Sequence, residues 1–279
     1  MSALRVVRVA PALRRASIGL SPALPRTDVL TDPLFLLVAI PAVTFLGLAK
    51  GGFSGVGMVA TPLLALILPP LQAAAILLPI LLLQDVISVW VYRRDFSTAN
   101  LKVLIPGGAL GVVVAWALAA YVSDHHVRFA IGLIGVVFVL NAWLGRVPTT
   151  AKPATTPAGL FWGAVAGFTS TLSQAGSPPF QVYVLPQRLP KMTLVGTAAI
   201  FFAAVNLMKV APYFALGQFS TEGLVTTLAL TPLAVATNFL GIWLVQRTPT
   251  ELFYRIAYVL VFLICLALLW QGGRHILGI

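Results

Sequence analysis

The sequence predicts an all-α polytopic membrane protein made of two inverted repeats, each opening with a broken helix or helical hairpin that three spanning helices follow. Of the 279 residues, 59% are hydrophobic and only 9% are charged, whereas soluble domains average about a quarter charged residues. Two of the long apolar runs are interrupted near their middle by glycine, serine and proline. A short motif also recurs in the second half of the chain.

Residues 1–32 form a basic tail ahead of the apolar runs. The tail carries the arginines Arg5, Arg8, Arg14, Arg15 and Arg26. Its apolar stretches are too short for a signal-peptide core, so we expect a disordered or surface-lying tail, with a misassigned translation start as the alternative.

The net charge of +11 over the whole chain does not indicate nucleic-acid binding. Most bases stand singly or in pairs between apolar runs, which is typical of charges that orient a membrane protein.

Eight apolar runs predict the membrane segments, since a spanning helix needs about twenty residues. They cover roughly residues 33–69, 70–92, 102–122, 127–145, 157–187, 192–216, 223–245 and 252–271. The first and fifth exceed one span. The first break covers 49–57 (AKGGFSGVG) and the second break covers 169–179 (TSTLSQAGSPP). Non-helical backbone at membrane depth must be buried in protein or line a watery cavity. The breaks therefore predict a site, and we expect each broken run to form a hairpin of two short helices whose tips meet.

The broken runs begin two related halves, residues 33–145 and 157–272, which a polar cytoplasmic linker at 146–156 joins. The segment 95–101 (DFSTANL) matches 218–224 (QFSTEGL) at four of seven positions. Each Phe-Ser-Thr motif places a hydroxyl where the next helix needs an N-cap. The sequence therefore predicts an internal repeat.

Basic residues lie in non-equivalent loops of the two halves. Loop 93–102 holds three bases and its counterpart 217–222 holds none, whereas 188–191 holds two and its counterpart 69–71 none. The positive-inside rule places loops 93–102, 146–152, 188–191 and 247–255 in the cytoplasm. Because equivalent loops fall on opposite sides, we expect inverted repeats, as in many secondary transporters.

Lys50, Asp85 and Lys209 lie inside apolar runs. A charge there costs at least about 2.5–3.5 kcal/mol on insertion scales, so these residues are functional candidates. Asp85 and Lys209 occupy nearly equivalent positions in the two halves. We expect them to handle substrate or protons; the alternative is an ion pair that locks the halves together. For Lys50, at the first break, the alternative is snorkelling to the membrane surface.

Both breaks carry groups that suit an anion. Ser177, followed by Pro178, has the form of an N-cap, and Ser54-Gly55 would open a helix in the same way. Helix N-termini present free N–H groups and a positive dipole end, and glycines let a ligand approach the backbone. The candidate binding residues are Lys50, Gly51, Gly52, Ser54, Gly55, Gly57, Ser170, Ser173, Gln174, Ser177 and Lys209. The alternative is that the glycines and serines only permit tight helix packing.

No catalytic triad, phosphate-binding loop or zinc-protease motif occurs in the sequence, and Cys265 stands alone in an apolar run. His125-His126 lack a third ligand for a metal ion. We therefore predict no enzymatic activity, no cofactor and no metal.

The residues resemble the TauE/SafE family of sulfite exporters and related anion permeases, over about residues 33–272. The likeness rests on Lys50 to Gly57 with Pro62, on Asp85 with Tyr92-Arg93, on Gly167-Phe168 through Ser177, and on Asn206 with Lys209. The resemblance adds Asn206 to the candidate site. It implies a multi-pass protein that moves sulfite, organosulfonates or similar small anions across the bacterial inner membrane.

We therefore expect a secondary transporter, most simply an exporter, of a small sulfur-containing anion. Asp85 would pair with a lysine when the site is empty or would carry a coupling proton. The predicted partners are this small anion and the lipid bilayer, and no oligomeric state is predicted. Two alternatives stay open, an anion channel and a non-transporting membrane assembly module.

Overall fold

The computed structural model describes residues 33–54, 56–64, 70–118, 124–144, 153–215 and 219–277, and every regular element in these ranges is a helix. The first half contains α2 (Pro33–Gly51), the 3-10 helix η1 (Val56–Val59), α3 (Ala60–Leu64), α4 (Pro70–Tyr92), α5 (Thr98–Leu118) and α6 (Asp124–Trp143). The second half contains α7 (Thr156–Ser173), α8 (Ser177–Val184), the 3-10 helix η2 (Leu185–Gln187), α9 (Lys191–Ala215), α10 (Thr221–Arg247) and α11 (Thr250–Leu277). The basic tail 1–32 and residues 146–152 of the linker lie outside the described residues.

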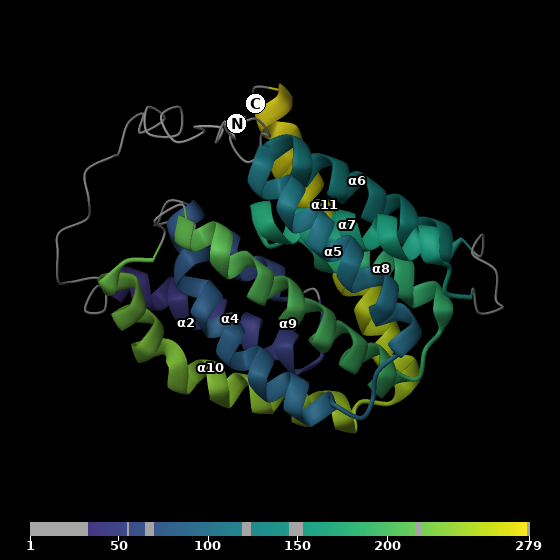
Figure 1. Cartoon of the computed structure of the whole chain (residues 1–279), viewed down its shortest axis with the longest axis horizontal. Helices are drawn as coiled ribbons and strands as arrows, with labels where there is room; N and C mark the ends of the chain where they lie inside the picture. Colours follow the sequence, from purple (N-terminus) through teal and green to yellow (C-terminus); the bar gives the residue numbers. More distant parts are fainter. Residues whose placement is uncertain are drawn as a thin grey trace, which may run out of the picture.

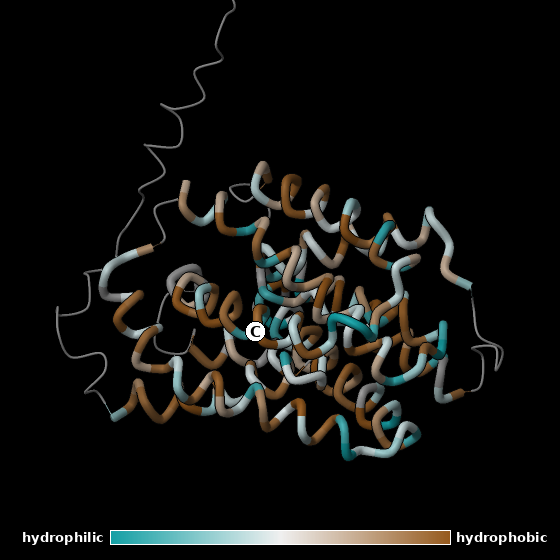
Figure 2. Tube along the Cα trace, turned by 60° about the horizontal axis from the view of Figure 1, so that its bottom comes forward, coloured by the Kyte–Doolittle hydropathy of each residue, from teal (hydrophilic) through white to brown (hydrophobic). Residues whose placement is uncertain are grey.

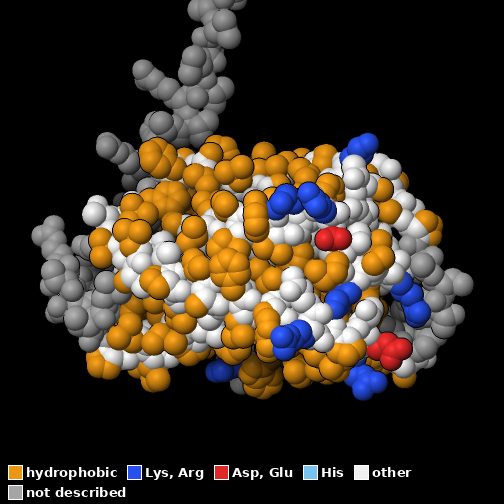
Figure 3. Space-filling model, turned by 90° about the horizontal axis from the view of Figure 1, so that it is seen from below, with side chains coloured by type: hydrophobic (Ala, Val, Ile, Leu, Met, Phe, Trp, Pro, Cys, Tyr) orange, Lys and Arg blue, Asp and Glu red, His pale blue; other side chains and the backbone are white. Residues whose placement is uncertain are grey.

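Six described helices, namely α2, α4, α5, α9, α10 and α11, are long and apolar enough to cross a membrane. Hydrophobic positions dominate along the helices (Figure 2), and hydrophobic side chains cover much of the face in Figure 3, where Lys and Arg occupy mainly one half. Leu37 and Phe214 are 70% and 76% exposed. So large an apolar surface requires lipid around it. The chain is therefore a multi-pass membrane protein.

The two halves interleave rather than forming separate bundles (Figure 1). Each main helix pair joins one half to the other: α2 packs on α10, α5 on α7, α4 on α9 and α6 on α11. Under the predicted repeat, in which α2 corresponds to α7 and α5 to α10, exchanging the halves leaves these pairs unchanged. The helices α4 and α9 form the centre, where α10 packs on α4 and α5 packs on α9.

The helices α4 and α9, which the predicted repeat makes equivalent, run in opposite directions. Tyr92, at the end of α4, lies beside Gly196 near the start of α9. Asp85, two turns earlier in α4, contacts Asn206 further along α9. Two halves of opposite orientation require antiparallel pairs of this kind. The orientation of each half relative to a membrane stays a prediction.

The Phe-Ser-Thr motifs cap α5 and α10, as predicted. The Ser97 hydroxyl accepts the N–H of Asn100 at 3.3 Å, and the Ser220 hydroxyl accepts the N–H of Gly223 at 3.0 Å. The backbone N–H of Ser97 also donates to the Thr197 hydroxyl of α9 at 2.9 Å. The first cap therefore fixes the turn after α4 against the start of α9.

Both broken runs fold back on themselves, but the arms are unequal. The helix α7 has 18 residues and α8 has 8. The Tyr183 hydroxyl donates to the Thr155 carbonyl at 3.3 Å, so α8 returns along α7. In the first half, Gly57 lies against Ala49 of the 19-residue α2. The expected hairpins of two short helices are corrected to one long and one short arm, because the apolar stretch before each break is unbroken.

Three loops that carry bases gather at one end of the molecule. We call this the basic end and define it by residues 93–97, 188–191 and 247–255. Lys191 Nζ donates to the carbonyls of Val245 and Thr248 at 2.7 and 2.6 Å. The Tyr254 hydroxyl donates to the Leu189 carbonyl, and the Ser97 bond to α9 brings the third loop alongside. Loops that the positive-inside rule assigns to one side thus lie together, and the side itself stays a prediction.

Glycines let the paired helices cross closely. A Cβ added at Gly111 of α5 would lie 2.0 Å from the Ala164 carbonyl oxygen of α7. A Cβ at Gly51 of α2 would lie 2.4 Å from the Cα of Gly241 in α10. Small residues at such crossings are how membrane helices pack. The alternative interpretation of the glycines, tight packing, therefore applies to Gly51.

We expect Gly111→Ala to destabilise the protein by about 1–3 kcal/mol, because the new methyl group overlaps the α7 backbone. Gly273→Ala is the matched control, since a Cβ there would meet only the Phe129 ring at 3.7 Å. Alanine also favours a helix over glycine by about 1 kcal/mol, so the control should be neutral or stabilised. Thermal unfolding in detergent compares the two variants. Equal stability would contradict the close α5–α7 crossing.

Candidate functional site

A cavity of about 90 Å³ lies between the two breaks and the central helices α4 and α9. Leu77 and Leu81 of α4 and Val195 and Phe202 of α9 form apolar walls, while the breaks supply polar groups. Because one water needs at least about 10–15 Å³ of such space, the cavity has room for several waters or one small anion.

Most of the predicted binding residues line this cavity. They are Lys50, Gly52, Ser54, Gly57, Ser170, Gln174, Ser177 and Asn206. Gly51 does not line it, because its backbone packs on α10 and its carbonyl accepts the Tyr92 hydroxyl at 2.5 Å. Lys209 does not line the cavity, but it contacts Ser170 and Gln174, which do. Gly55 lies outside the described residues, as does the side chain of Ser173.

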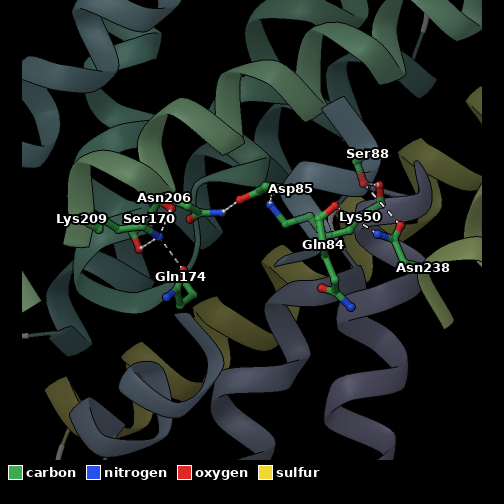
Figure 4. Close-up of polar contacts among 9 residues, drawn as sticks. All are labelled: Lys50, Gln84, Asp85, Ser88, Ser170, Gln174, Asn206, Lys209 and Asn238. Atoms are coloured by element: carbon green, nitrogen blue, oxygen red, sulfur yellow. Dashed lines mark hydrogen bonds and ion pairs between the residues drawn. The ribbon is translucent and has the colours of Figure 1, made fainter. Parts of the chain in front are cut away.

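Asp85 is the centre of a buried polar chain that joins the two halves. Lys50 and Asn206 point toward it from opposite sides (Figure 4). Its Oδ1 accepts a hydrogen bond from Lys50 Nζ in an ion pair, and its Oδ2 accepts one from Asn206 Nδ2 at 2.7 Å. The side chains of Lys50 and Asp85 are 11% and 5% exposed, so little water screens the pair. One carboxylate therefore connects α2, α4 and α9.

Lys209 of α9 is fully buried and is held by neutral oxygens of the second break (Figure 4). Its Nζ donates to the Ser170 hydroxyl at 3.1 Å, the Ser170 carbonyl at 3.4 Å and Gln174 Oε1 at 2.9 Å. Three acceptors match the three N–H groups of an ammonium. Asp85 thus pairs with Lys50, whereas the sequence had left open an ion pair between Asp85 and Lys209.

With Lys209 protonated, the three ionisable groups would give this region an excess positive charge. Lys50 and Asp85 neutralise one another, while Lys209 has no carboxylate partner in the part of the chain that the structure describes. A buried charge is costly unless it is paired. The arrangement favours an anion beside Ser170 and Gln174, whose side chains contact Lys209 and also line the cavity.

Thr169 fixes the second break, although sequence reasoning did not single it out. Its carbonyl accepts the N–H of Ala175 at 3.2 Å, and its hydroxyl can donate to the Val165 carbonyl at 2.8 Å or to the Ala175 carbonyl at 3.0 Å. Gln174, just before Ala175, adopts a left-handed conformation with φ 56°. Such a backbone is unfavourable for a residue with a side chain and persists where contacts impose it. The clamp holds Gln174 beside Lys209.

The prediction that Ser177 is the N-cap of α8 was wrong. Gly176 occupies that position, and Ser177 is the first helical residue. The Ser177 hydroxyl accepts a hydrogen bond from Gln181 Nε2 at 3.0 Å instead of capping the helix. The prolines 178 and 179 have no N–H, so this helix start offers few backbone donors to an anion. The Ser-Pro pattern predicted a helix that starts at Pro178. After the left-handed turn at Gln174, α8 instead starts one residue earlier, at Ser177.

Gln181 of α8 joins the second break to the first, and it too was missed. Its Nε2 donates to the Ser54 carbonyl at 2.7 Å as well as to Ser177. The two breaks therefore meet, as the sequence predicts for the hairpin tips. A single glutamine in an apolar stretch gives no signal of such a contact.

Further polar residues lie on the other side of Lys50 from Asn206 (Figure 4). The Ser88 hydroxyl donates to the Lys50 carbonyl at 2.8 Å. Asn238 Nδ2 of α10 donates to the Gln84 carbonyl of α4 at 3.1 Å. Sequence reasoning passed over these uncharged residues, which hold the end of α2 against α4 and α10.

Comparison with known proteins supports one family. The profile of the family described as Sulfite exporter TauE/SafE matches residues 39–268. No curated protein and no solved structure matches the chain. The matched region contains both breaks, the cavity and the charged residues Lys50, Asp85 and Lys209. The chain therefore belongs to the TauE/SafE sulfite exporter family.

Proposed function

We propose that this protein is a secondary transporter that exports a small sulfur-containing anion, such as sulfite or an organosulfonate, across the bacterial inner membrane. Its family consists of transporters of the anion-exporter type. The observation that carries the proposal is the fully buried Lys209, which has no carboxylate partner among the described residues and stands behind the cavity. A small anion in the cavity would balance its charge.

Gln174 supplies a second reason to place an oxyanion in the cavity. Its Oε1 accepts a hydrogen bond from Lys209 Nζ, so the Nε2 of the same amide points away from Lys209. That Nε2 is buried and has no hydrogen-bond partner among the described residues. An unmade bond at a buried donor costs about 1–3 kcal/mol. An oxyanion oxygen beside Gln174 would recover this loss, and the hydroxyls of Ser54 and Ser177 at the cavity wall would add further donors.

Asp85 is the proposed proton carrier. When Asp85 is ionised, it holds Lys50 in the ion pair and leaves one net positive charge for the anion. When Asp85 gains a proton, the pair loses its Coulomb attraction and the ammonium of Lys50 turns to the anion in the cavity, which it already lines. Proton binding and anion binding then favour one another, which is the linkage that coupled transport requires.

Transport by the purified protein in liposomes tests the function directly. The panel is sulfite, sulfate, thiosulfate, sulfoacetate, taurine and chloride, each with and without a pH gradient, followed by current and by tracer flux. We expect a saturable flux for a sulfur-containing anion that responds to the gradient. A non-saturating conductance would indicate the anion channel instead, and no flux by either method would contradict the proposal.

Lys209→Ala should abolish transport while the protein remains folded in the membrane. Removing one member of a buried charge pair typically costs roughly hundredfold or more in affinity, and the anion would lose its main counter-charge. Lys102→Ala, at an exposed position of α5, is the matched control and should retain transport. Tracer uptake at equal amounts of reconstituted protein measures both. Transport by Lys209→Ala at the parent rate would remove Lys209 from the mechanism.

Asp85→Asn should bind the anion more tightly and lose the pH dependence of transport. The substitution keeps the hydrogen-bonding shape but removes the charge that neutralises Lys50 and the group that would titrate. Asp95→Asn, exposed in the turn after α4, is the control and should behave like the parent. Initial rates across a range of pH compare the variants. A parent-like pH profile in Asp85→Asn would exclude Asp85 as the proton carrier.

A further inference from the structure

The contact between Gln181 and Ser54 lies where two hollows of the protein adjoin. The main cavity and a second, smaller hollow share Gly52 and Ser54 in their walls. Gln181 forms part of the wall of the second hollow. The hydrogen bond from Gln181 Nε2 to the Ser54 carbonyl therefore lies at the boundary between them.

The second hollow lies on the side of the basic end. Its wall includes Leu185 and Leu194, which flank the basic loop 188–191 in the sequence, and Phe253, which belongs to the loop 247–255. All three side chains are buried and apolar. An apolar constriction excludes water and ions unless it widens or presents a polar group.

Gln181 is the polar group at this boundary, and its bonding suits a contact that opens. The residue is 2% exposed, and its Nε2 donates to both the Ser54 carbonyl and the Ser177 hydroxyl. Its Oε1 is buried with no hydrogen-bond partner in the described ranges, so the closed contact leaves one acceptor unsatisfied. Rotation of this one side chain would release two N–H donors to a passing anion and expose Oε1 to water.

We propose that Gln181 closes the anion path between the main cavity and the basic end, and that its amide donates to the anion as the path opens. This inference rests on the proposed transport function. It assigns a residue outside the charged site a role in admitting the anion. Because the amide is neutral, it closes the path without holding the anion there by charge.

Thiol labelling tests the gate without any transported substrate. Ala199→Cys places a reporter in the wall of the main cavity, while the native Cys265 is fully buried and sets the background. The probe is the membrane-impermeant anion sulfonatoethyl methanethiosulfonate, applied to inside-out and right-side-out vesicles. Arg93→Cys, exposed at the basic end, identifies the vesicle side on which that end lies.

With Gln181 intact, we expect slow labelling of the reporter from the side of the basic end. Gln181→Ala should accelerate labelling from that side roughly tenfold, because two hydrogen bonds that hold the path closed are lost. Gln181→Asn, which is too short to reach Ser54, should do the same with less disturbance of packing. Labelling from the other side should not change in either variant.

Gln187→Ala is the matched control. Gln187 is a buried glutamine of the same hairpin, but its amide pairs with Asn100 and lines neither hollow. Monodisperse elution in detergent shows that each variant is folded. Parent-like labelling in both Gln181 variants, or fast labelling from the basic end in the parent, would overturn the proposal. Failure of the transport function would appear instead as absent flux in liposomes, whatever the labelling result.

Discussion

The cost of holding charges away from water determines the centre of this protein. Lys50, Asp85 and Lys209 lie in apolar helices where each charge needs a partner, and the structure supplies the partners from different elements. Asp85 of α4 accepts hydrogen bonds from Lys50 at the first break and from Asn206 of α9, while Lys209 donates to oxygens of the second break. Satisfying three charges thus brings both breaks and both central helices together. The cavity is the space that this arrangement leaves.

The interleaved fold makes this arrangement possible. If each half formed its own bundle, the breaks would be separated by two complete sets of helices. Instead α2 packs on α10 and α7 on α5, so each break begins against a helix of the other half. The segments after the breaks reach the central pair, since α3 packs on α4 and Phe180 of α8 stacks on Phe201 of α9. Glycines at the crossings, such as Gly111, reduce the distance between paired helices to backbone contact. Helix packing and site geometry therefore depend on the same small residues.

The sequence revealed the features that carry a strong local signal. The apolar runs, the two breaks, the caps at Ser97 and Ser220 and the buried charges follow from composition and spacing alone. It did not reveal which residues meet, because that depends on contacts between distant segments: Asp85 pairs with Lys50 rather than Lys209, and Ser177 bonds to Gln181 instead of capping α8. Thr169, Gln181 and Asn238 were missed since a neutral polar side chain in an apolar helix has no distinctive pattern. The unequal arms of the hairpins likewise depend on packing.

In the proposed mechanism, charged residues bind the anion at the main cavity, and a neutral amide contacts it at the boundary toward the basic end. A transporter must bind its anion firmly enough to select it and weakly enough to release it. Two unpaired lysines at the cavity would hold an anion strongly, but the Lys50–Asp85 ion pair reduces the net charge that the anion meets to that of Lys209. At the boundary toward the basic end, the amide of Gln181 provides donors without any net charge. An anion that moves from Lys209 toward the basic end would therefore meet a neutral donor rather than a second charge, which favours its release.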